Sequence, residues 1–252
     1  MRIVVRGVVQ GVGFRPTVYR IATSMGLNGW VQNNGSNVII AVDRDADEFV
    51  KRLHEELPPL ARLDSVEIVE GDVHDEGFHI VPSSVGQRGV GIPNDSAMCD
   101  DCRREMLTPG GRRYHYPFTN CTNCGARFTI IEDLPYDRGK TSMHEFPMCP
   151  ECRAEYDDPS ARRFHHQTIC CPRCGPHYYL LDEEGKRIAA DDPVAYFAKQ
   201  MERGAIGVAK SWGGMHLCCS LATLPRLRRW YRRVQKPFAV MVRDMEAVRR
   251  YG

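Results

Sequence analysis

Cys99-Asp-Asp-Cys102 is followed, after eighteen residues, by Cys121-Thr-Asn-Cys124, and the same spacing returns from Cys149 to Cys174. The two copies are offset by fifty residues. A Cys-x-x-Cys turn points two sulfurs at one ion, and two such turns complete a tetrahedron with a radius of about 2.3 Å. The repeat therefore predicts two four-thiolate zinc sites. Their expected ligands are Cys99, Cys102, Cys121, Cys124, Cys149, Cys152, Cys171 and Cys174.

The pairing of these cysteines has two solutions. The duplication favours one ion in each copy, and a crossed arrangement, in which outer pairs share one ion and inner pairs the other, uses the same residues. The repeat also extends beyond the cysteines, because Arg112, Arg113 and His115 recur as Arg162, Arg163 and His165. Four thiolates already satisfy a tetrahedral ion, so we do not expect the histidines to be ligands. Cys170, Cys218 and Cys219 are expected to be buried small side chains.

A disulfide framework is the alternative explanation for eleven cysteines, and it would suit an exported protein. Residues 1–10 show no basic segment followed by an apolar one, and no later run reaches the roughly eighteen apolar residues that span a bilayer. The sequence therefore predicts a cytoplasmic protein without a membrane segment. The net charge of +2 over 252 residues gives no reason to expect a nucleic-acid partner, although arginines cluster at 226–233.

The first eighty residues alternate between strand and helix periodicities. The expected elements are a strand at 3–9, a helix at 16–26, strands at 30–33 and 38–42, a helix at 45–57, and short strands at 66–69 and 78–81. Asn34-Gly35 predicts a type I′ turn between the hairpin strands, and Asp45 with Glu48 predicts a capping box at the second helix. This order indicates the ferredoxin-like βαββαβ arrangement, and hence an α+β fold.

A glycine loop, Gln10-Gly11-Val12-Gly13-Phe14-Arg15-Pro16, joins the first strand to the first helix. Its backbone amides can converge at the positive end of the helix and bind a phosphate group. Arg15 adds a guanidinium that matches two phosphate oxygens. The candidate phosphate-binding residues are Gly11, Val12, Gly13, Phe14 and Arg15. A plain tight turn is the competing interpretation, because glycine loops before helices are common.

The loop and Gly29-Trp30-Val31-Gln32-Asn33 together resemble the signature of the acylphosphatase family. The resemblance implies that Arg15 binds the phosphate dianion and that Asn33 orients the attacking water. Positioning and charge stabilisation suffice for a carboxylic-phosphoric anhydride, which already carries a good leaving group. Turn geometry is the competing explanation for an asparagine near a hairpin.

The cysteine-rich segment resembles the zinc region of the HypF carbamoyltransferase family of [NiFe]-hydrogenase maturation. The resemblance is carried by Tyr116-Pro-Phe-Thr-Asn-Cys121-Thr-Asn-Cys124-Gly125, Leu134-Pro-Tyr-Asp-Arg138 and Cys149-Pro-x-Cys152. It implies a reaction that cleaves carbamoyl phosphate, adenylates the carbamate with ATP and Mg²⁺, and transfers the carbamoyl group to the C-terminal cysteine of a HypE-like partner. The rival hypothesis is a zinc-dependent interaction module, like the cysteine-rich region of DnaJ-type chaperones, beside a silent scaffold.

The last segment combines a helix starting at Pro193, a strand at 205–209 and a glycine turn after Lys210. Together with Lys236-Pro-Phe-Ala it resembles the opening of the nucleotide-binding YrdC-like domain of the same family, so Lys210 and Lys236 are candidate nucleotide contacts. We therefore expect three regions: an acylphosphatase-like domain at 1–86, a double zinc finger at 93–180, and an incomplete α/β YrdC-like segment at 187–252. Such a chain would perform at most the first step of the family reaction.

Overall fold

The computed structural model describes residues 1–86 and 93–251, so Gly252, the end of the expected third region, lies outside it. The chain forms two compact units, Met1–His177 and Tyr178–Gly252. The first unit contains β1 (Arg2–Val8), α1 (Phe14–Ser24), β2 (Gly29–Asn34), β3 (Asn37–Val42), α2 (Ala46–Glu55), β4 (Arg62–Val69), β5 (Phe78–Ile80), α3 (Asp100–Leu107) and α4 (Pro150–Asp157). The second contains β6 (Leu180–Leu181), β7 (Arg187–Ile188), α5 (Pro193–Glu202), β8 (Ile206–Lys210), β9 (Met215–Cys219), α6 (Leu224–Trp230) and α7 (Met245–Tyr251).

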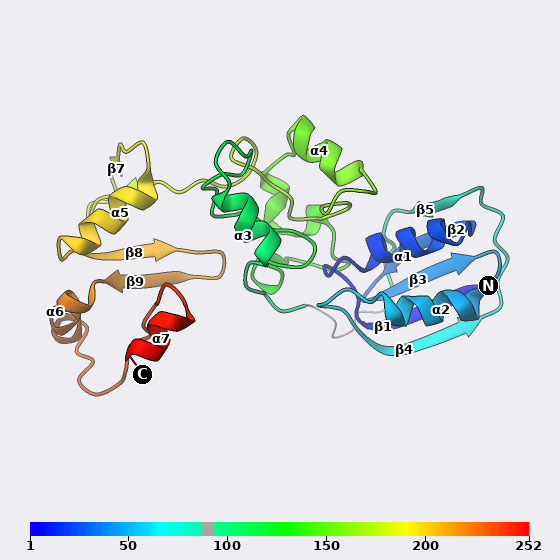
Figure 1. Ribbon diagram of the computed structural model, residues 1–252, viewed down its shortest axis with the longest axis horizontal. Helices are drawn as coiled ribbons and strands as arrows, with labels where there is room; N and C mark the ends of the chain where they lie inside the picture. Colours follow the sequence, from blue (N-terminus) through cyan, green and yellow to red (C-terminus); the bar gives the residue numbers. More distant parts are fainter. Residues whose placement is uncertain (87–92, 252) are drawn as a thin grey trace. The chain divides into compact units, whose positions relative to one another are not determined.

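A five-stranded sheet with the order β4-β1-β3-β2-β5 organises the start of the first unit. β1 lies antiparallel between β3 and β4, and β5 runs parallel to β2. Helices α1 and α2 lie on the same side of this sheet (Figure 1). The predicted α+β fold is confirmed, with the short β5 added to the edge of the βαββαβ core.

The core between sheet and helices is apolar and fully buried. Ile3 and Val5 of β1, Val18 and Ile21 of α1, and Phe49 of α2 belong to one buried cluster. Burying each such side chain contributes roughly 1.5–3 kcal/mol. The sheet therefore provides a rigid support for the loop that joins β1 to α1.

The predicted type I′ turn is wrong. β2 and β3 pair Asn34 with Asn37, so Gly35 and Ser36 are the central residues. Gly35 has a φ of 59°, whereas Ser36 is not left-handed, and a type I′ turn needs positive φ at both positions. Positive φ at the first central position alone is typical of a type II′ turn with glycine there. The Asn34-Gly35 pair does not show whether glycine takes the first central position of a type II′ turn or the second of a type I′ turn.

The predicted capping box at α2 is also not formed. Asp45 occupies the N-cap position, but its φ of 51° is left-handed and its side chain makes no capping hydrogen bond. An N-cap side chain reaches the helix amides from an extended backbone, which Asp45 lacks. Its carboxylate instead lies 3.6 Å from Arg44 Nε.

The cysteine-rich region, residues 93–177, repeats its backbone as well as its sequence. Cys99 and Cys149 occupy the N-cap positions of α3 and α4. His115 and His165 take the same left-handed conformation, with φ values of 55° and 50°. The remainder is turns and short 3-10 segments, so side-chain interactions must hold this region together.

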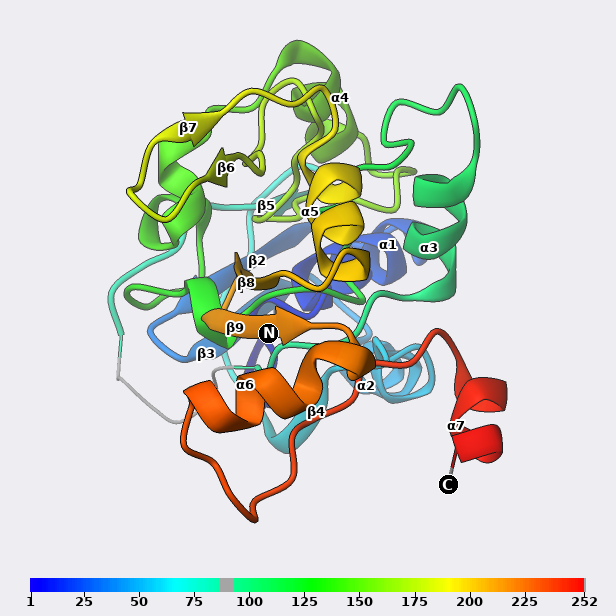
Figure 2. The same ribbon diagram turned by 90° about the vertical axis from the view of Figure 1, so that its left-hand side faces the viewer.

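In the second unit, α5 packs against the β8–β9 hairpin (Figures 1 and 2). Asp192 caps α5 by accepting hydrogen bonds from the amides of Val194 and Ala195. Cys218 and Cys219 are half-buried, contrary to the expectation of full burial, because the two-stranded sheet has too few neighbours to enclose them. No helix in residues 1–86 and 93–251 combines the length and apolar character needed to cross a bilayer.

Candidate phosphate site and metal centres

The loop between β1 and α1 has the backbone conformation of an anion cradle. Gly11 and Gly13 have φ values of 69° and 79°, which other residues rarely adopt. None of the amides of residues 11–15 donates a hydrogen bond to another described residue. These free donors lie at the N-terminus of α1, where the helix dipole favours an anion.

Arg15 projects from the first turn of α1 and is 9% exposed. Its Nη2 atom donates to Asp137 Oδ1 at 3.0 Å, and its Nη1 atom lies 3.4 Å from Ser83 Oγ. The guanidinium is therefore held beside the cradle by groups from two distant parts of the chain.

Asn33 lies on β2 and is fully buried. Neither its amide nitrogen nor its amide oxygen has a hydrogen-bond partner among the described residues. Its carbonyl accepts the amide of Ser84, next to the Ser83 that contacts Arg15. An unpaired buried amide costs about 1–3 kcal/mol, so such a group is a strong candidate for binding a ligand.

The cysteine-rich region covers the cradle. Thr122, Tyr136, His165 and Gln167 line a cavity of about 20 Å³ together with residues of the loop. A Cβ atom on Gly11 would lie 3.1 Å from the Tyr136 ring, and one on Gly13 would lie 3.1 Å from Thr122 Cβ. The packing therefore favours glycine at both positions, in addition to the positive φ.

Arg127 joins the cradle to the first cysteine turn. It is fully buried, and its Nε atom donates to the carbonyl of Gly11. Its Nη atoms donate to the carbonyls of Cys121 at 2.7 Å and Cys124 at 3.0 Å. A single guanidinium therefore couples the backbone around the metal ligands to the backbone of the phosphate loop.

The eight predicted ligand cysteines form two clusters, and within each the four Sγ atoms lie within 4.8 Å of one another. Each cluster takes its cysteines from one copy of the repeat and not from crossed pairs. Cys121 Sγ lies 3.7 Å from Cys99 Sγ and 3.8 Å from Cys124 Sγ. A tetrahedral thiolate site with bonds of about 2.3 Å has edges of about 3.8 Å, so the donor set fits one metal ion per cluster.

Cys170 stays outside both clusters. It is buried, and its Sγ atom lies 3.5 Å from the carbonyl of Phe118. Burial raises the pKa of its thiol to about 11, so it remains protonated at neutral pH.

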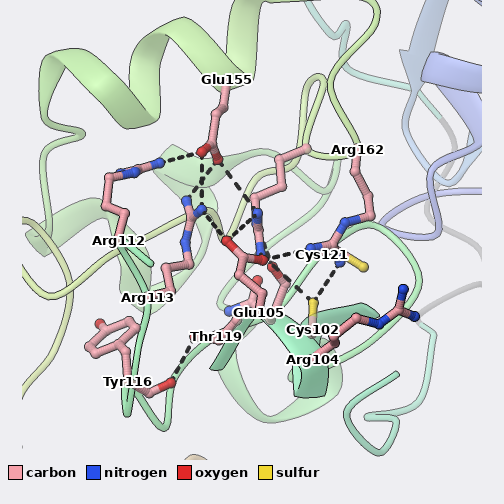
Figure 3. Close-up of polar contacts among 12 residues, drawn as sticks. Cys102, Arg104, Glu105, Arg112, Arg113, Tyr116, Thr119, Cys121, Glu155 and Arg162 are labelled. Atoms are coloured by element: carbon pink, nitrogen blue, oxygen red, sulfur yellow. Dashed lines mark hydrogen bonds and ion pairs between the residues drawn. The ribbon is translucent and has the colours of Figure 1, made fainter. Parts of the chain in front are cut away.

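In each copy an arginine contacts a ligand cysteine of the other copy, and Figure 3 shows one of the two contacts, from Arg162 to Cys102. Arg112 of the first copy donates to Cys152 Sγ of the second at 3.1 Å. Reciprocally, Arg162 of the second copy donates to Cys102 Sγ of the first at 2.9 Å. A four-thiolate metal site carries net negative charge, and each copy supplies a positive charge to the ligands of the other.

Glu105 and Glu155 form ion pairs with these two arginines and with the neighbouring Arg113 and Arg163. Arg113 is 1% exposed and bridges Glu105 and Glu155 at 2.8 Å each. Arg163 pairs with Glu105 at 2.6 Å. Burial alone would raise the pKa of Glu155, but hydrogen bonds and charges from Arg113 and Arg112 outweigh it and lower that pKa to about 2. The network is therefore ionised at neutral pH.

The two lysines expected to contact nucleotide remain predictions. Lys210 Nζ donates to the carbonyl of Ser211 at 2.9 Å, and the Lys236 carbonyl accepts from Arg228. No described contact joins the two side chains.

Comparison with known proteins accounts for both parts of the first unit. The acylphosphatase family model matches residues 1–80, and the HypF finger model matches residues 98–131 and 148–181. Carbamoyltransferase HypF2 of Cupriavidus necator is 48% identical over 262 residues, which cover 100% of this chain and 32% of that protein. The chain belongs to the HypF family. It matches the N-terminal part of HypF and spans about a third of the length of the curated relatives that it matches.

A solved structure of full-length HypF, in a phosphate- and nucleotide-bound form, superposes with a TM-score of 0.91 at 43% identity. The match covers 98% of this chain and 34% of the HypF chain in that structure. An acylphosphatase of Caldivirga maquilingensis is 42% identical over 87 residues, with 90% of that protein and 32% of this chain covered. These matches favour a HypF-like role over a chaperone-like interaction module.

The cradle residues and the ligand cysteines are predictions from the sequence, and three further groups at the site were not predicted. Asp137 lies in the Leu134–Arg138 motif that carried the HypF resemblance, yet nothing in its pattern indicates Arg15 as its partner. Nothing in the sequence around Arg127 indicates its contact with Gly11. The sequence shows that Arg112 recurs as Arg162. It does not show that each arginine contacts a cysteine of the other copy.

Proposed function

We propose that the first unit of this chain hydrolyses acyl phosphates, with carbamoyl phosphate as the substrate, as the first step of HypF-type carbamoyl transfer. The observation that supports this most directly is the buried side chain of Asn33, which has no hydrogen-bond partner within residues 1–86 and 93–251 and lies beside the segment that contacts Arg15. An unpaired amide at this place is expensive for the fold and useful for holding a water or a substrate oxygen.

The mechanism follows from charge and position. The free amides of residues 11–15 and the Arg15 guanidinium bind the phosphoryl oxygens and stabilise charge in the transition state. Asn33 orients a water molecule for attack on phosphorus. The new P–O bond forms as the bond to the carbamate oxygen breaks, and the products are carbamate and inorganic phosphate. The leaving group departs as an anion, so the chain needs no strong general base.

The metal ions are proposed to be zinc, held by the two four-cysteine clusters. Four thiolates leave no open coordination position, so the metal stabilises the cysteine-rich region and does not touch substrate. Through Arg127 it supports the carbonyl of Gly11 and hence the shape of the cradle. Adenylation with ATP and Mg²⁺, transfer to a HypE-like acceptor and a cytoplasmic location belong to the proposal for the full-length protein.

The test is phosphate release from carbamoyl phosphate by the purified chain. Arg15→Ala should abolish release, because it removes the charged phosphate ligand. Asn33→Ala should lower release by at least about a hundredfold, the lower range for a group that positions reactants, while the thermal stability stays equal or rises. Metal content measured on the same samples must be unchanged. Undiminished release in the Arg15 variant would refute the assignment.

A further inference from the structure

Arg15 already has an anionic partner inside the chain. Asp137 Oδ1 accepts a hydrogen bond from Arg15 Nη2 at 3.0 Å, and the Tyr136 carbonyl lies 3.4 Å from the same nitrogen. The side chain of Arg15 is 10% exposed and that of Asp137 is 33% exposed. The ion pair is therefore shielded on the arginine side and reachable by solvent on the aspartate side.

Both terminal nitrogens of Arg15 already have partners in this arrangement. Nη2 donates to Asp137 and lies near the Tyr136 carbonyl, and Nη1 lies 3.4 Å from Ser83 Oγ. Phosphoryl oxygens that bind the same nitrogens compete with these contacts. Among these partners Asp137 is the charged one, so it is the strongest competitor.

No second carboxylate pairs with Arg15 in the described part of the chain. His165 also lines the cavity, but burial, followed by the positive charge of Arg15, lowers its pKa to about 4. Its ring is neutral at pH 7 and neither replaces nor balances the Asp137 charge. The negative charge beside the cradle comes from Asp137.

We propose that Asp137 is a built-in competitor of phosphate at Arg15. Its carboxylate pairs with the guanidinium when the site is empty, must be displaced by substrate, and returns to displace inorganic phosphate after hydrolysis. This inference rests on the proposed function, since it assigns the cysteine-rich region a direct part in the phosphate site. The competition weakens phosphate affinity and thereby favours product release.

The test compares the equilibrium binding of inorganic phosphate to the metal-loaded chain and its variants by titration calorimetry. Asp137→Asn keeps the size and a hydrogen-bond acceptor but removes the charge, so phosphate should bind about fivefold tighter or more, as expected for removing a negative charge within several ångströms of a dianion. The control Asp133→Asn removes a carboxylate from the same turn that pairs with Lys140 at 3.2 Å, and it should leave the affinity unchanged. Asp137→Ser repeats the test if the first variant fails to fold.

Equal or weaker phosphate binding by a folded Asp137 variant would overturn the inference, because a residue that merely orients Arg15 would lower affinity when removed. The proposed function is tested separately by turnover. If the wild type releases phosphate from carbamoyl phosphate and Asp137→Asn binds no tighter, the competitor role alone fails. If the wild type shows no turnover, the proposed function fails, while the change in phosphate affinity still decides the role of Asp137.

Discussion

The sheet region, residues 1–86, and the cysteine-rich region lie in one compact unit, but they are held together by different interactions. Seventeen buried residues, all aliphatic or aromatic, form the core of the first. The second region also buries apolar side chains, such as Tyr136, Met143 and Phe164, but its ligand cysteines form two further buried clusters beside arginines that pair with Glu105 and Glu155. The sheet region is thus stabilised by apolar burial, whereas the cysteine-rich region adds metal ligation and ion pairs to its apolar burial.

Removal of the metal should give the largest difference in stability between the two regions. Structural zinc contributes about 10 kcal/mol or more to small cysteine domains, so a chelator should unfold residues 93–177 while the sheet keeps its apolar core. Hydrogen exchange read by mass spectrometry should show lost protection in α3 and α4 and retained protection in β1 and β3. Equal loss of protection in both regions would show that the sheet also depends on the metal.

Replacing one buried arginine should have the next largest effect. Arg113→Ala leaves Glu105 and Glu155 without their most buried partner, and breaking a buried ion pair typically costs about 3–5 kcal/mol. The matched control is Arg104→Ala. The Arg104 side chain is 73% exposed and pairs with Asp101, so its removal should change the free energy of unfolding by no more than about 0.5 kcal/mol. Chemical denaturation of the metal-loaded protein measures both. Similar values for the two variants would mean that the arginine network adds little to the metal sites.

The smallest effect should come from the packing between the two regions. Gly13→Ala and Gly110→Ala both place a side chain at positive φ, which costs about 1–2 kcal/mol. Only at Gly13 does the new Cβ lie 3.1 Å from Thr122, whereas at Gly110 nothing lies within 4 Å. The difference in the free energy of unfolding should therefore be about 1 kcal/mol, the lower range for overpacking. No difference would indicate that the two regions adjust to each other freely.

Local signals in the sequence were enough to predict the sheet region. Strand and helix periodicity, together with the glycine loop, located β1, α1 and the cradle, because each depends on residues close in the chain. The predicted turn centred on Asn34 and Gly35 lies one residue too early, because Gly35 and Ser36 are the central residues. Type I′ and type II′ turns both favour glycine, so the sequence did not fix the position. The catalytic roles of Arg15 and Asn33 stay predictions.

Contacts between distant residues could not be predicted in the same way. Asp137 lies 122 residues from Arg15, and no periodicity records which cation a surface carboxylate meets after folding. Cysteine spacing predicted two clusters and left the pairing open, because two arrangements satisfy the same ligand count. The contacts of Arg112 and Arg162 with the other copy's cysteines could be found only from the positions of both copies in space.

These reciprocal contacts bear on the origin of the repeat. Arg112 reaching Cys152, and Arg162 reaching Cys102, is the reciprocal pattern of an interface between two identical subunits related by a twofold axis. One copy by itself would leave its own thiolates without the guanidinium that the other supplies. A protein carrying a single copy would have had to form a homodimer to complete both sites, and gene duplication followed by fusion would convert that assembly into one polypeptide.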